Sequence, residues 1–199
     1  MPSAAERARR APIGATEAQR YGEWLVREQR VPLEHLEPRT NPAELPNEVE
    51  VNLDRARLLS RLETFGLRAR PVVGDGNCQF RAVSDQLYGD ESHHGVVRGL
   101  CVDQLLCTAA RYEDYVVAES YDAYVAKMSQ LGEWGDHVTL QALADSLRVE
   151  INLVTSFESG GLVRVTPQEP SAGQPRPPGG PPLWLAFWAE VHFNSIEMT

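Results

Sequence analysis

The stretch GDGNCQFRAVSDQL, residues 74–87, contains one cysteine at the point where a glycine-rich turn leads into an amphipathic run. Gly74 and Gly76 permit a sharp turn, and apolar residues then recur at helical spacing, so Cys78 is expected in the first turn of a helix. A thiol reacts as its thiolate, a form that the positive end of a helix dipole favours. The N–H groups of such a turn can also stabilise an oxyanion. The pattern therefore predicts a nucleophilic cysteine.

A nucleophilic cysteine needs a general base, and His192 is the best placed of the five histidines. It stands at the end of the aromatic run LWLAFWAEV, which is typical of a strand, and Asn194 follows two residues later. Residues i and i+2 of a strand point the same way, so Asn194 is placed to fix the second ring nitrogen of His192. Cysteine early, with histidine and asparagine late, is a papain-like arrangement.

The remaining cysteines and histidines have simpler interpretations. Cys101 lies on the apolar face of a predicted helix and Cys107 near its end, so both are expected to serve in packing. Three cysteines without a CxxC pair make a disulfide framework or a structural zinc site unexpected. A metal at the adjacent His93 and His94 is the alternative, although no second ligand pair has a suitable spacing. His35 and His137 are expected to be solvated.

The elements that must position these residues are helices first and strands afterwards. Helical spacing predicts helices over residues 53–65, 92–110, 112–117, 121–130 and 136–147, the first ended by Gly66 and the last opened by Asp136. The runs VEINLVTSF, GLVRVTP and LWLAFWAEVHFNSI are rich in β-branched and aromatic residues and are predicted as strands. This order favours a single α+β domain with helices packed around a small central sheet.

Proline and glycine divide the 199-residue chain. Residues 1–50 are predicted to hold a helix over 16–30 and a linker rich in proline and glutamate over 31–50. The compact domain is expected to span residues 51–199. Within it, residues 167–182 are rich in proline and glycine and are expected to form a disordered surface insertion.

Composition narrows the class of partner. The formal net charge of -9 argues against nucleic acid and suits a basic partner instead. No apolar run approaches the roughly 20 residues of a membrane span, and the N-terminus has no apolar signal region. We therefore expect a cytoplasmic protein, with the nucleus as the alternative compartment, that acts as a monomer without membrane contact.

Three motifs together, DGNCQFRA, WGDHVTLQALAD and FWAEVHFNSI, closely resemble the ovarian-tumour (OTU) family of cysteine deubiquitinases, most nearly its plant-type members. The likeness runs from about residue 53 to residue 196. It implies a papain-like OTU protease fold, with Cys78 as nucleophile, His192 as general base and Asp75 as the motif aspartate. The family has Asn or Asp two residues after the histidine, which is Asn194 here. Gly74, Gly76 and Asn77 would then belong to the oxyanion and substrate-binding turn.

The resemblance implies a thiol-dependent isopeptidase that acts on ubiquitin or polyubiquitin chains and needs no metal or organic cofactor. The alternatives are a catalytically weak ubiquitin-binding module and an isopeptidase for another ubiquitin-like modifier. The presence of Cys78, His192, Asn194 and Asp75 together favours the enzyme. Linkage choice depends on surfaces that short motifs do not encode.

Overall fold

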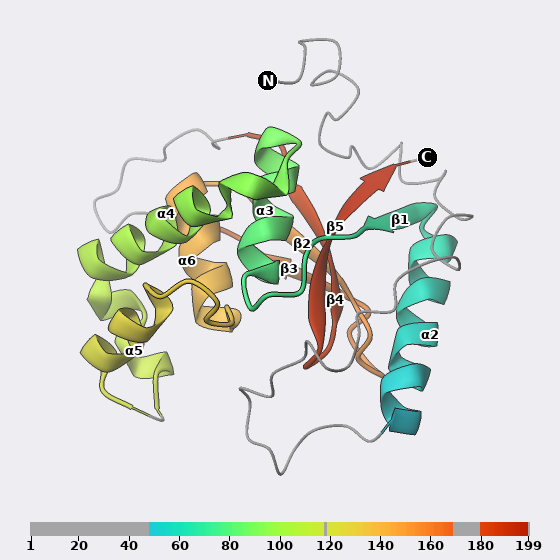
Figure 1. Cartoon of the computed structure of the whole chain (residues 1–199), viewed down its shortest axis with the longest axis horizontal. Helices are drawn as coiled ribbons and strands as arrows, with labels where there is room; N and C mark the ends of the chain where they lie inside the picture. The colour runs from blue at the N-terminus through green and yellow to red at the C-terminus, as the bar shows by residue number, and fades with distance from the viewer. Residues whose placement is uncertain (1–47, 118, 169–179, 199) are drawn as a thin grey trace.

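A mixed five-stranded sheet forms the centre of the molecule in a computed structural model that describes residues 48–117, 119–168 and 180–198 (Figure 1). The strand order is β1-β5-β4-β2-β3. Strands β4 and β2 run parallel, and the other neighbours are antiparallel. The strands are β1 (Leu67–Arg70), β2 (Ile151–Thr155), β3 (Leu162–Val165), β4 (Leu183–Trp188) and β5 (His192–Met198).

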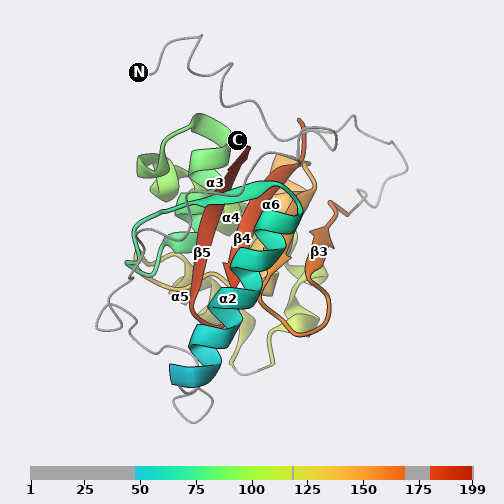
Figure 2. The same cartoon turned by 90° about the vertical axis from the view of Figure 1, so that its right-hand side faces the viewer.

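Helices cover both faces of this sheet. One face is crossed by α2 (Glu48–Thr64), which lies in front of the strands in Figure 2. The other face is covered by α3 (Cys78–Tyr88) and α6 (His137–Leu147), with α4 (His94–Cys107) packed against both of them and α5 (Tyr121–Met128) against α4 (Figure 1). Short 3-10 helices occupy Glu91–His93, Ala109–Arg111 and Glu113–Tyr115. The arrangement confirms the predicted α+β class, with helices around a central sheet.

Strand alternation produces two hydrophobic clusters, one on each face of the sheet. Leu153 and Leu185 face the larger cluster, which includes Phe80 of α3. Their neighbours Val154 and Ala186 face the smaller cluster beneath α2. The sheet is therefore buried on both faces in its central strands, and this fixes the register of β4 and β2.

The helix that begins after Asp136 shows how local sequence sets an element boundary. The Asp136 carboxylate accepts hydrogen bonds from the backbone N–H groups of Val138 and Thr139, and the Thr139 hydroxyl accepts one from the Asp136 N–H. This reciprocal pair is a capping box, which satisfies N–H groups that the first turn leaves open. The predicted start of this helix is confirmed.

Two features of the sheet differ from the sequence predictions. The run LWLAFWAEVHFNSI is not one strand but the hairpin of β4 and β5, which are paired antiparallel and joined at residues 189–191. His192 therefore begins β5 instead of ending the preceding strand, and Glu190 in the turn has a positive φ of 57°. Strand β1 was not predicted, since four residues with alternating leucine or alanine and arginine give little signal.

Some predictions lie outside the described residues. These are the helix over residues 16–30, most of the linker over 31–50, and the greater part of the proline- and glycine-rich insertion, of which 169–179 is not described. The helix predicted from residue 53 starts earlier, at Glu48, and ends before Gly66, whose φ is 63°. Among the described helices, none is both long and apolar enough to cross a membrane.

Candidate active site

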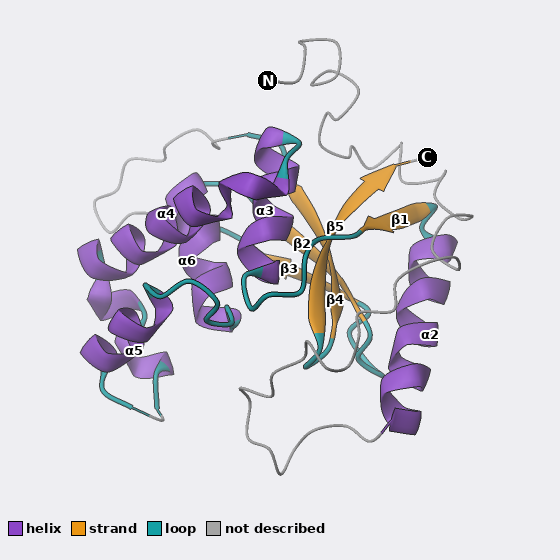
Figure 3. Cartoon of the chain, viewed as in Figure 1, coloured by secondary structure: helices purple, strands orange, loops and turns teal. Residues whose placement is uncertain are grey.

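The turn before α3 adopts a conformation that its glycines make possible. Gly76 has a φ of 80°, a region that residues with a side chain rarely adopt. A Cβ atom at residue 76 would lie 1.9 Å from the carbonyl oxygen of Gly132, so the turn packs directly against the loop between α5 and α6. Gly74 lies two residues earlier and is partly exposed. Figure 3 shows the two loops, in teal, meeting beside the first turn of α3.

The thiol predicted to be the nucleophile lies at the start of α3, as expected, and it is buried. Cys78 is 4% exposed. Burial raises the pKa of the Cys78 thiol to about 11, although hydrogen bonds from the backbone of Phe193 and of Gln79 act in the opposite direction. The helix N-terminus therefore does not by itself produce a thiolate here, and Cys78 keeps its proton at neutral pH.

The strand that begins with His192 lies against the helix that begins with Cys78, because α3 packs against β5. The backbone of Phe193, the next residue, forms a hydrogen bond with Cys78. His192 is 2% exposed, and its Nε2 atom has no hydrogen-bond partner among the described residues. Burial lowers the pKa of His192 to about 4, against hydrogen bonding with the Val72 backbone and the Asn194 side chain. The imidazole is therefore neutral, with one ring nitrogen available to accept a proton.

Asn194 lies where strand alternation predicts, on the same side of β5 as His192. Its side chain forms a hydrogen bond with the imidazole. Its Oδ1 atom also accepts a hydrogen bond from the backbone N–H of Val72 (3.2 Å), in the loop that follows β1. Asn194 thus connects the histidine to the segment that leads to the cysteine.

Asp75 makes its contacts inside the turn. Its carboxylate accepts hydrogen bonds from the backbone N–H of Asn77 (3.1 Å) and from Nε (3.0 Å) and Nη2 (2.6 Å) of Arg81. Burial acts to raise the pKa of Asp75, but these hydrogen bonds and the Arg81 charge hold it well below its usual range. The ionised carboxylate therefore braces the turn against α3.

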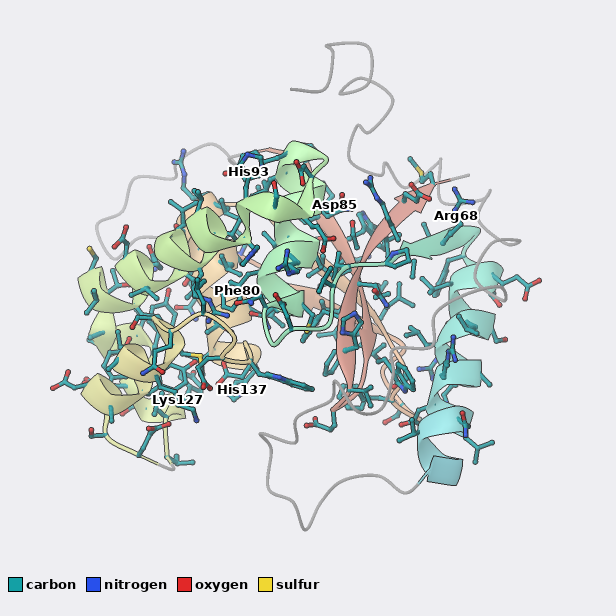
Figure 4. The ribbon with its side chains drawn as sticks, in the orientation of Figure 1. Arg68, Phe80, Asp85, His93, Lys127 and His137 are labelled. Atoms are coloured by element: carbon teal, nitrogen blue, oxygen red, sulfur yellow. The ribbon has the colours of Figure 1, made fainter. Side chains whose placement is uncertain are left out.

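A cavity of about 550 Å³ lies beside His192. One wall is the loop between α5 and α6, and the others come from β2, β3 and the turn between β4 and β5. Figure 4 labels Lys127 and His137, two lining residues on neighbouring helices. The lining also includes four aromatic rings and three carboxylates: Trp134, Phe157, Phe187, Phe193, Glu133, Asp136 and Glu190. An extended peptide with apolar and basic side chains would suit such a lining.

Sequence reasoning assigned no role to Trp134, Gln79 or Arg98. Trp134 lies two residues before Asp136, where the helix is predicted to start, and it lines the cavity. Gln79 is fully buried, and its Nε2 atom donates to the carbonyl of Asp136 (3.0 Å). Arg98 lies three residues before Cys101 on the apolar face of α4, so a charged residue at a buried helical position was the available signal.

Comparison with known families gives a match over most of the described domain. The sequence model for OTU-like cysteine proteases matches residues 73–192. "OVARIAN TUMOR DOMAIN-containing deubiquitinating enzyme 12" of Arabidopsis thaliana is 46% identical over 165 residues, which are 83% of this chain and 71% of that protein. Enzyme 9 of the same series is 43% identical over 84% of this chain, but the match spans only 46% of that longer relative.

Solved structures show the same fold at lower sequence identity. The OTU domain of OTUD1 superposes with a TM-score of 0.59 at 21% identity, covering 75% of this chain and 97% of that one. An OTU domain solved in complex with ubiquitin has a TM-score of 0.51 at 18% identity and covers 65% of this chain and 69% of that one.

Proposed function

Because the chain belongs to the OTU-like cysteine protease family, we propose that it is a thiol-dependent deubiquitinase, which hydrolyses the isopeptide bond after the C-terminal glycine of ubiquitin. One observation carries the proposal. A cysteine at a helix N-terminus lies against the strand that begins with a buried histidine. That histidine lines a cavity, and its Nε2 atom has no hydrogen-bond partner in the part of the chain that the structure describes. This is the arrangement that nucleophilic catalysis by a thiol requires.

The reaction would proceed through a thioester. Sγ of Cys78 attacks the carbonyl carbon of the substrate glycine while its proton passes to Nε2 of His192. The C–N bond then breaks as the lysine amine leaves with that proton. Water hydrolyses the thioester in the second half of the reaction, with His192 as base, and restores the thiol. Because both Cys78 and His192 are neutral in the resting site, the attack requires transfer of the thiol proton to the imidazole.

The turn would supply the oxyanion stabilisation. The first backbone N–H groups of α3 have no acceptor within the helix and lie at its positive end. Asn194 would hold the orientation of the imidazole, whereas Asp75 would shape the turn in which Gly74, Gly76 and Asn77 lie. Removing one oxyanion donor in another protease lowers kcat by roughly 100- to 1,000-fold, so the turn matters to catalysis nearly as much as the thiol.

The cavity supports ubiquitin as the substrate. The ubiquitin tail is basic and ends in two glycines, which fits a lining with carboxylates at Glu133 and Glu190. The formal net charge of -9 would also attract the basic ubiquitin tail at long range. We expect the enzyme to act as a monomer on ubiquitin or its chains.

The test is incubation with a panel of di-ubiquitins and with probes of other ubiquitin-like modifiers, for the wild type and Cys78→Ala side by side. The proposal expects cleavage of at least one ubiquitin linkage by the wild type and none by Cys78→Ala. Cleavage restricted to another modifier would replace the substrate. Binding of ubiquitin without cleavage would identify a binding module instead.

A further inference from the structure

Arg98 is a buried cation in the second turn of α4, beside the candidate active site. Arg98 is only 2% exposed. Nη1 donates to the carbonyl of Met128 (2.9 Å), and Nη2 donates to the carbonyl of Glu133 (2.7 Å) and to Oδ1 of Asn77 (2.7 Å). The guanidinium carbon lies 3.9 Å from the centre of the Phe80 ring. Figure 4 shows Phe80 on α3, facing the helices on that side of the sheet.

These acceptors belong to three segments that must meet for the site to form. Met128 ends α5, Glu133 lies on the cavity wall, and Asn77 directly precedes the nucleophile. A single guanidinium therefore joins the end of one helix, one wall of the cavity and the turn before Cys78. The planar fork of arginine can direct several N–H groups at fixed angles, which the ammonium of lysine cannot reproduce.

Asn77 is the point where these contacts converge. It is 4% exposed, and its Oδ1 atom accepts from the backbone N–H of Gly132 (2.9 Å) as well as from Arg98. Its Nδ2 atom donates to the carbonyl of Asp75 (3.4 Å). The close approach of Gly76 to Gly132 needs the same alignment of the two loops. A shift of Arg98 would therefore move the peptide between Asn77 and Cys78.

Keeping this cation buried costs free energy, so a gain elsewhere must offset the cost. Burial lowers the pKa of Arg98 to about 10, which still leaves it protonated at neutral pH. An apolar side chain of similar volume could fill the space between α4 and Phe80, but it would leave the carbonyls of Met128 and Glu133 without these donors. The contacts therefore indicate a role in positioning.

We propose that Arg98 is a positioning residue for catalysis, which aligns the turn at Asn77 and Cys78 with the cavity wall at Glu133. The inference rests on the proposed role of Cys78 as nucleophile. In this role Arg98 touches neither the substrate carbonyl nor the thiol. Its hydrogen bonds couple the shape of the cavity to the geometry of the oxyanion turn.

The experiment compares Arg98→Lys, Arg98→Gln, Asn77→Ala and the double variant Arg98→Gln/Asn77→Ala with the wild type. The control is Arg70→Gln, which removes an ion pair with the buried Asp85 (3.2 Å) at a residue on β1, outside both loops. Three quantities are measured for each: Tm, kcat and KM on ubiquitin with a fluorogenic C-terminal amide, and the pH dependence of Cys78 alkylation by chloroacetamide.

We expect Arg98→Lys to lower kcat by about 100-fold, the size of loss that a misplacement of about 1 Å can cause, with a smaller change in KM. The pH profile of Cys78 alkylation should shift in Arg98→Lys and Asn77→Ala. The double variant should lose little more kcat than Arg98→Gln alone, because both changes break the same contact. Arg70→Gln should lower Tm and leave kcat and the alkylation profile unchanged.

The inference is overturned if folded Arg98→Lys and Asn77→Ala keep the wild-type kcat and alkylation profile. It is also overturned if their kcat falls no further than that of Arg70→Gln at a similar loss of Tm. Should Arg98→Gln fail to fold, Arg98→Lys and Asn77→Ala still decide the question. If the wild type cleaves no ubiquitin substrate but Arg98→Lys still shifts the alkylation profile, the proposed function fails and the positioning role stands.

Discussion

Asn194 and Asp75 are both close to His192, and their contacts separate their roles. Asn194 bonds to the imidazole and to the Val72 backbone, whereas the carboxylate of Asp75 is engaged by Asn77 and Arg81. We expect Asn194→Ala to lower turnover and shift the pH–rate profile while the turn stays in place. Asp75→Ala should lower turnover by displacing the turn.

Kinetics over a range of pH, together with crystal structures of both variants, measure this difference. The roles would have to be exchanged if Asp75→Ala kept the turn and moved the His192 pKa while Asn194→Ala did neither. Asn194→Asp is the conservative control for Asn194→Ala, because the aspartate carboxylate retains an acceptor oxygen for the imidazole and for the Val72 N–H.

Local rules predicted the positions of two candidate site residues in their elements. A glycine-rich turn before a helix placed Cys78, and the two-residue repeat of a strand placed Asn194 beside His192. Their burial depends on the packing of α3 against β5, which no local pattern reveals. For this reason the opposite pKa shifts of Cys78 and His192 could not be predicted, and the role of Arg98 was missed.

At the scale of the element, the turn before α3 should be intolerant of any side chain at Gly76. Its φ of 80° and the 1.9 Å approach of an added Cβ to the Gly132 oxygen both oppose Gly76→Ala. We expect a loss of roughly 1–3 kcal/mol of stability from the backbone conformation alone, and a larger loss of activity. Urea denaturation and kcat measure the two effects.

Gly99 provides the matched control for this substitution. It lies inside α4, and an added Cβ would meet nothing within 4 Å. Gly99→Ala should raise the free energy of unfolding by about 0.5–1 kcal/mol through helix propensity, with turnover unchanged. An active, fully stable Gly76→Ala would show that the close packing of the two loops is not required.

The helices were easier to predict than the sheet. The cap at Asp136 and the glycine after α2 are local signals, and the structure confirms both. The hairpin between β4 and β5 was missed because the run from Trp184 to Ile196 contains neither Gly nor Pro, and the turn uses Glu190 in a left-handed conformation instead. Strand β1 depends on pairing with β5 at the far end of the chain.

For the whole molecule, the buried neutral His192 makes stability depend on pH. Its pKa is lowered from 6.5 to about 4, so the unfolded chain binds a proton over that interval that the folded chain does not. The free energy of unfolding should therefore fall as the pH drops from 6.5 to 4. It should fall further below pH 3.8, where unfolded Asp75 becomes protonated.

Urea denaturation at a series of pH values measures this dependence. His192→Gln should flatten the curve between pH 6.5 and 4. Substitution of the exposed His137 by Gln is the control and should leave the curve as it is in the wild type. A His192→Gln curve parallel to that of the wild type would contradict the burial of a neutral imidazole.

Excision of the proline- and glycine-rich stretch tests the outline of the domain. The backbone N–H of Gln168 donates to the buried Asp145 (2.7 Å), so the deletion should begin after it and cover residues 169–179. Changing loop length alters closure entropy by only about 0.6 kcal/mol per doubling. We expect a Tm close to that of the wild type, whereas a sharp fall would mean that the segment packs against the domain.

The central claim is that Cys78 is the nucleophile of a ubiquitin-directed thiol enzyme. Cys101 is fully buried and Cys107 is exposed, so the chain contains its own comparison thiols. Incubation with ubiquitin that carries a C-terminal electrophile, followed by mass spectrometry of the digested adduct, identifies the reacting cysteine directly. We expect one adduct, on Cys78, that is lost in Cys78→Ala and forms more slowly in His192→Gln. An adduct on Cys101 or Cys107, or labelling that persists in Cys78→Ala, would contradict it.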